Sequence, residues 1–234
     1  MFPDMKIFDS YNGGKGSNGT YQTIINLIPP CKTLIIPFLG NCAILRNIKL
    51  PPCTIAIDKD AAVIKKWQEN FTNSAVTFIN GDAISFLKSF AAIIDNSETV
   101  IYCDPPYLMS SRRSQKNIYN YEMSFQDHQD LLSSIKSLRS RVLISAIKNE
   151  LYDSMLFDWS KKTYMNKTRH GMQEEIVYFN FSSNIEKLQD YSFLGDDFRK
   201  REIIKRKFNR WMKKVNSLST LQRNAFLFKI NNSK

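Results

Sequence analysis

The chain has 234 residues, of which 43% are hydrophobic and 12% aromatic, and this length can bury one substantial core with a small appendage. No apolar run approaches the roughly 20 residues of a membrane span, and residues 1–4 do not resemble a signal peptide, so we expect no membrane partner. The net charge of +11 favours a polyanionic partner.

The four cysteines form no C-x-x-C pair, and the chain has only two histidines. We therefore expect neither a disulfide framework nor a metal site. Each cysteine lies in or beside an apolar stretch, which predicts buried free thiols in a reducing cytoplasm. The cysteines are Cys31, Cys42, Cys53 and Cys103.

Residues 11–19 hold four of the eight glycines and lead into a segment with helical spacing over 20–28. A glycine loop that precedes a helix often cradles an anion or a nucleotide, because backbone N–H groups can approach the ligand. The segment is not a G-x-x-x-x-G-K-[ST] phosphate loop, since only Gly-Gly-Lys is present.

Two predicted strands follow, over 33–38 and 53–58. The first leads into a turn with Gly40, and the second ends in Asp58. A carboxylate about 20 residues after a glycine turn commonly binds ribose hydroxyls. The alternative is that Asp58 caps the helix predicted over 60–70.

A third strand over 75–80 leads to Asp82, which can cap the following helix or contact the adenine of a ligand. A fourth strand, over 99–103, is apolar throughout and ends at Asp104. Four strands that alternate with helices predict an α/β fold with a doubly wound parallel sheet, whose carboxyl ends meet at one crevice.

Asp104-Pro105-Pro106-Tyr107 stops this strand abruptly, because proline lacks an N–H and fixes φ. The corner offers a carboxylate, the carbonyl of Pro105, a second stiffening proline and an aromatic face. A planar amine could donate hydrogen bonds to the carboxylate and to the carbonyl while its ring stacks on Tyr107. The alternative is an ordinary proline turn after a strand.

The segment 108–124 has no clear period, and loops of this length are usually functional or mobile. Its basic and aromatic side chains suit phosphate contacts and base stacking, which predicts nucleic-acid binding. These side chains are Arg112, Arg113, Lys116, Tyr119 and Tyr121.

The remaining pattern predicts a helix over 124–140, a strand over 141–146 and a short helix over 149–157. A hairpin is then expected from strands 161–166 and 175–181, with Arg169 in its loop. His128 falls on the first of these helices, and we interpret it as structural.

Residues 199–214 carry nine Lys or Arg against one acid, whereas the rest of the chain has a net charge of only +3. An apolar stripe at helical spacing predicts that this basic helix packs one face on the sheet domain and leaves the cationic face free for nucleic acid. A solvated face without a partner is the alternative. The stripe is Ile204, Phe208, Trp211, Met212 and Val215, and the proposed contacts are Lys205, Arg206 and Arg210. We expect domains over 1–181 and 182–234.

In their order and spacing, these motifs resemble the Dam-type adenine-specific DNA methyltransferases, above all the small phage-type enzymes. The resemblance covers nearly the whole chain. The motifs are Gly13-Gly14-Lys15, Phe38-Leu39-Gly40, Asp58, Gly81-Asp82 and Asp104-Pro105-Pro106-Tyr107.

The resemblance implies a class I, Rossmann-like fold with a mostly parallel seven-stranded sheet, followed here by the basic helical extension. It also implies S-adenosyl-L-methionine (SAM) as methyl donor, DNA as substrate and a flipped-out adenine whose exocyclic amine is methylated. Tyr11 and Lys15 would lie along the methionine part of the cofactor, with Phe38 and Gly40 beside it. Asp58 would bind the ribose, Asp82 the adenine of the cofactor, and Asp104 would border both cofactor and target.

Two departures from the family pattern stand out. Cys42 replaces the second glycine of the usual Phe-x-Gly-x-Gly, and its Cβ is expected to crowd the cofactor or shift the turn. Only about twenty residues separate Asp82 from Asp104, which leaves no room for the sizeable target-recognition region of the Dam-type enzymes. Relaxed sequence specificity, with affinity dominated by phosphate contacts, is therefore our hypothesis.

The residues leave other readings open. Adenine in RNA is an alternative substrate, since nothing in the sequence reads a 2′-hydroxyl. A non-catalytic nucleic-acid-binding module is a further alternative, favoured only by Cys42. The recognition site, the role in restriction-modification, phage or orphan methylation, and the oligomeric state are not specified by the sequence.

Overall fold

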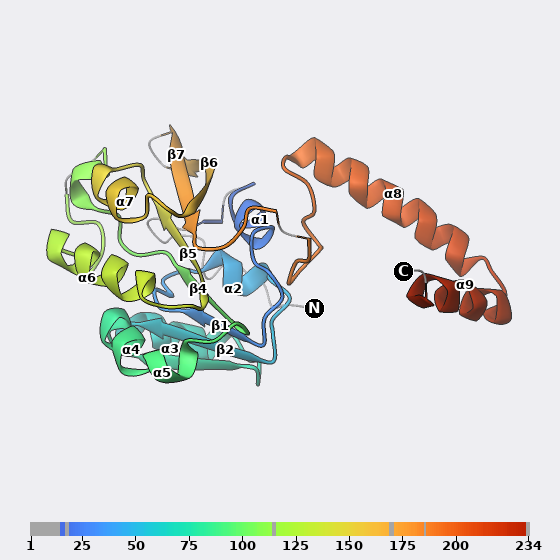
Figure 1. The fold of residues 1–234 in the computed structure, drawn as a ribbon, viewed down its shortest axis with the longest axis horizontal. Coiled ribbons are helices and arrows are strands. Elements are labelled where there is room, and N and C mark those ends of the chain that lie inside the picture. The colour runs from blue at the N-terminus through green and yellow to red at the C-terminus, as the bar shows by residue number, and fades with distance from the viewer. Residues whose placement is uncertain (1–14, 17–18, 114–115, 169–170, 185, 233–234) are drawn as a thin grey trace. The chain divides into compact units, whose positions relative to one another are not determined.

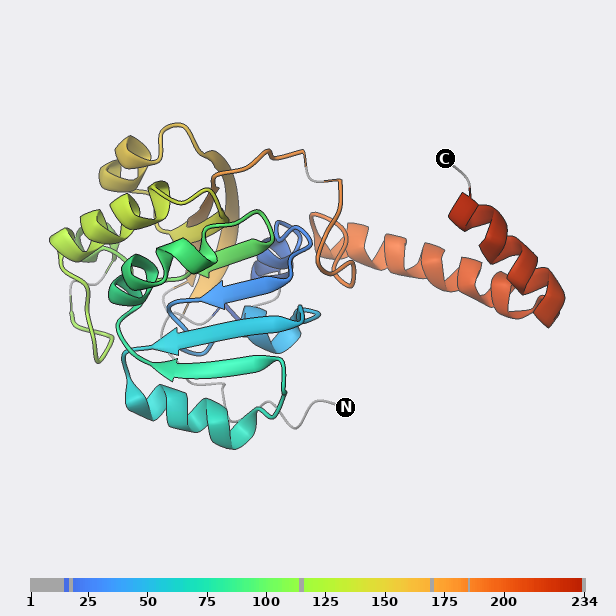
Figure 2. The same cartoon turned by 60° about the horizontal axis from the view of Figure 1, so that its bottom comes forward.

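The computed structural model describes residues 15–16, 19–113, 116–168, 171–184 and 186–232. Within them, seven strands form one sheet in the order β3-β2-β1-β4-β5-β7-β6, with helices on both of its faces (Figures 1 and 2). The five strands β1 to β5 are parallel to one another, whereas β7 is antiparallel to both of its neighbours, β5 and β6. The expectation of a doubly wound, mostly parallel seven-stranded α/β fold is confirmed.

The strands begin and end close to the predicted residues, except in the hairpin. There the two strands extend further toward each other, because their pairing continues to Thr168 and Gly171. The strands are β1 (Thr33–Ile36), β2 (Cys53–Asp58), β3 (Val76–Asn80), β4 (Thr99–Cys103), β5 (Arg141–Ala146), β6 (Ser160–Thr168) and β7 (Gly171–Phe179).

Helix starts are fixed by side-chain caps that satisfy backbone N–H groups. Ser124 and Asp127 form a reciprocal capping box at the start of α6. The helices of the sheet unit are α1 (Thr20–Ile25), α2 (Ala43–Asn47), α3 (Ala61–Asn70), α4 (Ala83–Ser89), α5 (Ala91–Ile94), α6 (Phe125–Lys136) and α7 (Glu150–Met155), with a 3₁₀ turn η2 (Met109–Ser111).

The core lies where the central strands meet α4, α6 and α7. Every residue of β4 is buried, and the four that follow Thr99 are apolar, which suits a strand covered on both faces. Leu131, Leu132 and Ile135 of α6 and Tyr152 of α7 belong to the same buried cluster. This packing holds the carboxyl ends of the parallel strands at one edge of the molecule.

The four cysteines are free, as predicted, but their expected burial is wrong for three of them. Cys103 is buried, Cys53 is exposed, and Cys31 and Cys42 are intermediate. Cys53 is the first residue of β2, where the strand has only begun to enter the core.

The chain divides into two compact units, Met1–Tyr191 and Ser192–Lys234. The first unit extends ten residues beyond Phe181 because residues after β7 bond to the sheet unit. The backbone N–H of Cys31 donates to Gln189 at 3.1 Å, and that of Lys49 donates to Asp190 at 2.7 Å. The predicted packing of the extension on the sheet domain stays a prediction.

The second unit consists of α8 (Phe198–Asn216) and α9 (Thr220–Asn232). Asp197 caps α8, Ser219 accepts a bond from the backbone of Gln222 in the first turn of α9, and Arg223 donates to carbonyls in the turn between the helices. No helix among the described residues is long and apolar enough to cross a membrane.

Candidate active site

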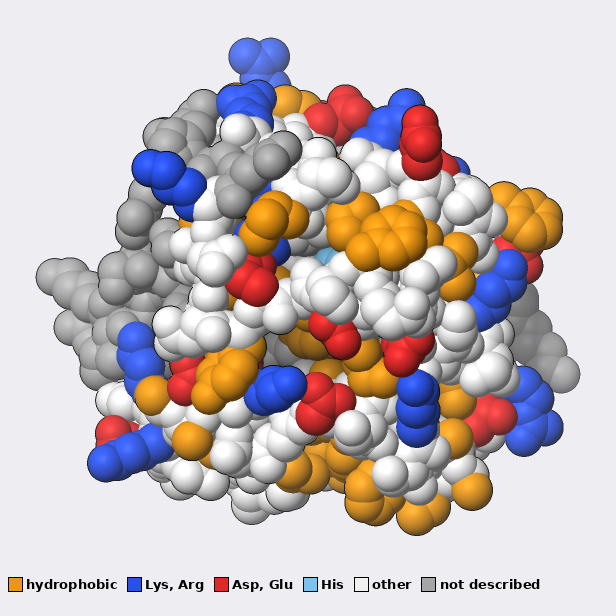
Figure 3. Space-filling view, turned by 90° about the vertical axis from the view of Figure 1, so that its left-hand side faces the viewer, with side chains coloured by type: hydrophobic (Ala, Val, Ile, Leu, Met, Phe, Trp, Pro, Cys, Tyr) orange, Lys and Arg blue, Asp and Glu red, His pale blue; other side chains and the backbone are white. Residues whose placement is uncertain are grey.

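A cleft opens at the carboxyl edge of the parallel strands, with an empty volume of about 1020 Å³ including its mouth. Figure 3 views this edge, where Asp and Glu side chains surround a hollow with hydrophobic side chains at its base. The cleft is lined by predicted site residues from the cofactor and catalytic motifs. They are Lys15, Phe38, Gly40, Asp58, Asp82 and Asp104, together with Pro105 and Pro106.

Asp58 organises the glycine turn. One carboxylate oxygen accepts a bond from the backbone N–H of Gly40 at 2.7 Å, and the other accepts from that of Asp60 at 2.9 Å. Gly40 has a φ of 44°, which favours glycine at this turn. Asp60, not Asp58, caps α3, so the alternative role of Asp58 as a helix cap is not observed.

Burial of Asp58 raises the pKa of its carboxyl, and the two backbone donors oppose this effect. A carboxylate held at the end of β2 beside a glycine turn can still accept bonds from vicinal hydroxyls, because each oxygen has more than one lone pair. This geometry suits the ribose of a nucleoside.

Cys42 does not strain the turn. Its φ of −49° and ψ of 101° lie outside the left-handed region, so no glycine is needed there. The Sγ atom accepts a bond from the backbone N–H of Leu45 at 3.4 Å and thereby caps α2. Cys42 also lines the cleft, and burial raises the pKa of its thiol to about 11.

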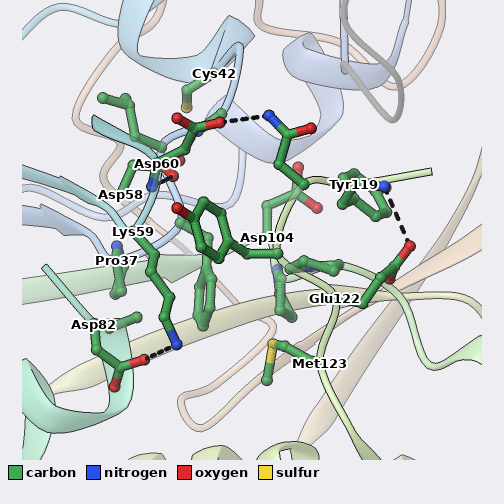
Figure 4. Close-up of a pocket in the computed structure, with 18 of the residues that line it drawn as sticks. Pro37, Cys42, Asp58, Lys59, Asp60, Asp82, Asp104, Tyr119, Glu122 and Met123 are labelled. Atoms are coloured by element: carbon green, nitrogen blue, oxygen red, sulfur yellow. Dashed lines mark hydrogen bonds and ion pairs between the residues drawn. The ribbon is translucent and has the colours of Figure 1, made fainter. Parts of the chain in front are cut away.

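Asp82 lines the cleft at the N-terminus of α4 (Figure 4). It accepts a bond from the backbone N–H of Ser85 at 2.8 Å and pairs with Lys59 at 3.6 Å. Burial opposes its ionisation, yet Ser85 and Lys59 together hold the pKa of Asp82 below its ordinary value. Asp82 therefore caps its helix and borders the cleft at once.

Asp104 follows the last residue of β4 and turns into the cleft, where its side chain is 20% exposed (Figure 4). The Nζ atom of Lys15 lies 3.0 Å from its Oδ1 atom. Burial raises the pKa of Asp104, and the negative charge of Glu175 adds to the effect, whereas Lys15 opposes it. The preceding residue, Cys103, is fully buried, consistent with a side chain on the opposite face of the strand.

Tyr107 is largely buried against Lys15, whose Nζ atom lies 4.5 Å from the centre of its ring and also donates a bond to its hydroxyl. The same hydroxyl donates to Glu175 at 2.8 Å. Lys15 thus contacts both the Asp104 carboxylate and the Tyr107 side chain. The sequence predicted that Lys15 lies along the methionine part of the cofactor, and that role stays a prediction.

Residues 119–123, the later part of the segment 108–124, form one wall of the cleft. Its side chains are Tyr119, Asn120, Tyr121, Glu122 and Met123, and the Asn120 amide donates a bond to Asp60, another residue of the cleft lining, at 2.7 Å. Burial raises the pKa of Tyr119 to about 12. The sequence assigned this segment only to nucleic acid, so its share in the lining of the cleft was missed.

Arg112 holds this wall together. Its guanidinium forms two bonds with Glu122, at 2.9 and 2.5 Å, and its Nε donates to the carbonyl of Tyr107 at 2.5 Å. The residue is 9% exposed. These bonds engage each of the three guanidinium nitrogens with groups of the protein. Contact of Arg112 with nucleic acid stays a prediction.

The other predicted nucleic-acid contacts that the structure describes lie in two parts of the chain, the segment 108–124 and α8. Arg113, Lys116 and Tyr121 are exposed, and Arg113 donates to the carbonyl of Met172 at 3.0 Å. The three contacts of α8 are also exposed. Tyr11 and Arg169 lie outside the described residues. The contacts on α8 are Lys205, Arg206 and Arg210.

Glu175 is a site residue that the sequence reasoning missed. It was counted as the first residue of a predicted strand, yet it is 2% exposed and bonds to Lys15, Tyr107, Tyr164 and Asn166. A charged residue beside the apolar run of β7 was the available signal, because carboxylates are rarely buried without partners.

Comparisons with known proteins agree with this geometry. Residues 57–170 match the family model of D12 class N6 adenine-specific DNA methyltransferases. No curated protein matches the chain.

Two solved structures superpose on the chain at low sequence identity. Precorrin 8W decarboxylase from Methanobacterium thermoautotrophicum does so with a TM-score of 0.50 at 16% identity, over 78% of this chain and 100% of that one. Magnesium protoporphyrin IX methyltransferase from Synechocystis PCC 6803, crystallised with bound SAM, has a TM-score of 0.43 at 13% identity, over 69% of this chain and 75% of that one.

The family match confirms a SAM-dependent methyltransferase, with SAM as the cofactor. Residues 57–170 of this chain thus resemble the D12 class N6 adenine-specific DNA methyltransferases, which agrees with the resemblance of its motifs to the Dam-type enzymes.

Proposed function

We propose that this protein transfers a methyl group from SAM to the exocyclic amine of a flipped-out adenine in DNA. The observation that carries the proposal is the position of Asp104. Its carboxylate directly follows a buried strand and lines the cleft together with Pro105 and Pro106, and the Tyr107 hydroxyl lies 3.5 Å from its Oδ1 atom. The proposed setting is the cytoplasm of a bacterial or phage-infected cell.

The cleft residues fit the cofactor. Gly40 lets the backbone approach closely, Asp58 offers carboxylate oxygens to ribose hydroxyls, and Phe38 offers an aromatic face. Asp82 would meet the cofactor's adenine, and Asp104 borders the methyl group. When bound, SAM supplies an electrophilic methyl group, and the electron pair of the broken carbon–sulfur bond stays on sulfur.

The target amine is a weak nucleophile, because its lone pair is delocalised into the adenine ring. Hydrogen bonds from its two N–H groups to Asp104 and to the Pro105 carbonyl would localise that lone pair and aim it at the methyl group. The Tyr107 ring would stack on the base. Positioning of this kind lowers a barrier by roughly 7–11 kcal/mol, and a carboxylate beside the developing positive charge adds to it.

DNA is the partner that the charge distribution favours. The described part of α8 presents a dense set of exposed Lys and Arg side chains, which suits contacts with phosphates. A duplex adenine must leave the base stack to reach Asp104. The short connection from α4 through α5 to β4 leaves no separate recognition region between Asp82 and Asp104, which supports relaxed specificity.

A tritiated-methyl transfer assay tests the proposal with duplex DNA, single-stranded DNA and RNA in competition. We expect label on N6 of adenine in DNA, and a methylome of the treated DNA should show short or degenerate sites. Preferential labelling of RNA would overturn the choice of substrate, and a long unique recognition site would overturn the relaxed specificity. Binding of DNA without any binding of SAM would instead support a non-catalytic module.

A further inference from the structure

Glu175 lies on β7, and its buried carboxylate contacts Lys15 and Tyr107, two residues that also lie beside Asp104. Its Oε2 atom accepts bonds from the hydroxyls of Tyr107 and Tyr164, both at 2.8 Å, and its Oε1 atom accepts from the Asn166 amide at 2.8 Å. The residue is 2% exposed. Four donors around one buried carboxylate, Lys15 included, define a built site rather than an incidental contact.

Lys15 is shared between two carboxylates. Its Nζ atom lies 3.0 Å from Asp104 and 3.1 Å from Glu175. Burial by itself would lower the pKa of Lys15, but Asp104 and Glu175 hold it well above its ordinary value, so the residue is an ammonium. Burial would raise the pKa of Glu175, whereas Lys15 and the hydrogen-bond donors hold it below its ordinary value.

With Asp104 and Glu175 both ionised, the cluster places two carboxylates around the one ammonium of Lys15. If Lys15 paired with Asp104 alone, the ammonium would neutralise the carboxylate that must accept a bond from the target amine. Glu175 competes for the same ammonium and leaves an excess of negative charge beside Asp104. The amine nitrogen becomes positive as its bond to the methyl carbon forms, until it releases one proton, so this excess favours the transfer.

Glu175 also fixes the stacking residue. The Tyr107 hydroxyl donates to Glu175, while the Tyr107 carbonyl accepts from Arg112, so both ends of the residue are held. A ring held in this way loses little freedom when a base stacks on it.

We propose that Glu175 is a positioning residue for methyl transfer: it shares Lys15 with Asp104 and anchors the Tyr107 hydroxyl, which keeps the Asp104 carboxylate available to the target amine. The inference rests on the proposed function, because it concerns the same amine. Nothing in the sequence motifs assigns such a role to β7.

The titratable groups around Asp104 and Glu175 come from several elements, so their charges must be considered together. Apart from Lys15 these groups are uncharged near neutral pH, because burial raises the pKa of each tyrosine and of the thiol. The groups are Lys15, Cys42, Tyr102, Tyr107, Tyr119 and Tyr164.

Glu175→Gln removes the charge but keeps the shape, and Glu174→Gln is its control. Glu174 precedes it on β7 and is exposed, so the control removes the same charge from the same strand. We expect kcat on adenine-containing DNA to fall at least tenfold in E175Q, with the Kd for SAM within threefold of wild type by calorimetry. E174Q should match wild type in both. Equal kcat values in E175Q and wild type would overturn the inference.

Glu175→Asp separates charge from shape. It keeps the negative charge but withdraws it by one methylene, so we expect a smaller loss of kcat than in E175Q. A merely structural side chain would tolerate the isosteric Gln better than the shorter Asp. Activity in the order E175Q above E175D would therefore contradict the charge-sharing role, and thermal unfolding identifies any variant that fails to fold.

An NMR titration of Asp104, which does not depend on methyl-transfer activity, completes the test. The carboxyl ¹³C resonance of Asp104, assigned with Asp104→Asn, reports its pKa in the full-length protein. In E175Q the pKa should fall, because Glu175 no longer raises it and Lys15 pairs with Asp104 alone. An unchanged pKa would overturn the inference whatever the substrate. Absence of methyl transfer to DNA by the wild type would instead refute the proposed function.

Discussion

At the scale of single residues, Asp104 directly follows the buried strand β4, and its carboxylate borders the cleft. Asp104→Ala removes the acceptor for the target amine but lies beyond the core residues of β4. We expect methyl transfer to fall at least about 1000-fold, in the range of losing a main electrostatic interaction, while circular dichroism shows an intact fold. Full activity in this variant would refute the mechanism.

Cys42 gives a second prediction at this scale. Cys42→Gly removes a Cβ from the cleft, and glycine is nearly as good an N-cap as the residues preferred there. We expect SAM to bind severalfold more tightly by calorimetry, with the free energy of unfolding changed by less than about 1 kcal/mol. Weaker binding in the glycine variant would show that the thiol contributes to the site.

His128 predicts how stability depends on pH. Its Nδ1 atom bonds to the Tyr152 hydroxyl at 2.9 Å and its Nε2 atom has no partner among the described residues. Burial, helped by the charge of Arg112, lowers the pKa of His128 to about 4, which agrees with a structural role.

Between about pH 6.5 and 4 the unfolded state therefore binds a proton that the folded state does not. The free energy of unfolding should fall by about 3 kcal/mol as the pH drops through this window, and His128→Gln should lose that part of the dependence. Urea unfolding at several pH values measures it. An unchanged pH dependence in the variant would contradict the assignment.

At the scale of elements, the cleft wall formed by residues 119–123 is held by the ion pair between Arg112 and Glu122. Arg112→Met leaves Glu122 without this guanidinium and frees the Tyr107 carbonyl, so the wall should loosen. We expect the Kd for SAM to rise about tenfold, equivalent to about 1.4 kcal/mol. Calorimetry measures the effect.

Arg113→Met is the matched control, since its side chain is exposed and lies outside the cleft. It should leave SAM binding unchanged and weaken binding to DNA. If both variants weakened SAM binding equally, the segment as a whole would matter rather than the Arg112 pair.

At the scale of the whole molecule, positive charge is concentrated in the second unit. Replacing Lys205, Arg206 and Arg210 with Ala should weaken DNA binding and reduce its salt dependence by about one unit of slope for each phosphate that the variant no longer binds.

The control replaces three exposed lysines of the sheet unit with Ala and gives the same net charge. These lysines are Lys32, Lys65 and Lys88. Fluorescence anisotropy across a salt series compares the two variants. Equal effects of the two variants on DNA binding would show that α8 contributes only through the net charge of the protein and does not contact DNA specifically.

Much of the fold follows from local sequence. Mostly apolar runs that end in polar turns predicted the five parallel strands. The signal is strongest for β1 and β4, because central strands that are covered on both faces are mostly apolar. The carboxyl ends of such strands share one edge, which is why the sequence alone placed Gly40, Asp58, Asp82 and Asp104 in one cleft.

Only the tertiary structure determined which partners these groups have. Glu175 lies 71 residues after Asp104 in the sequence, and only the antiparallel pairing of β7 with β5 and β6 brings it to Lys15 and Tyr107. Arg112 has the appearance of a phosphate ligand in the sequence, and its burial against Glu122 depends on the fold of the loop. Sequence determines where a strand ends and which charge stands there, whereas the pairing of buried charges depends on contacts between segments that are distant in the chain.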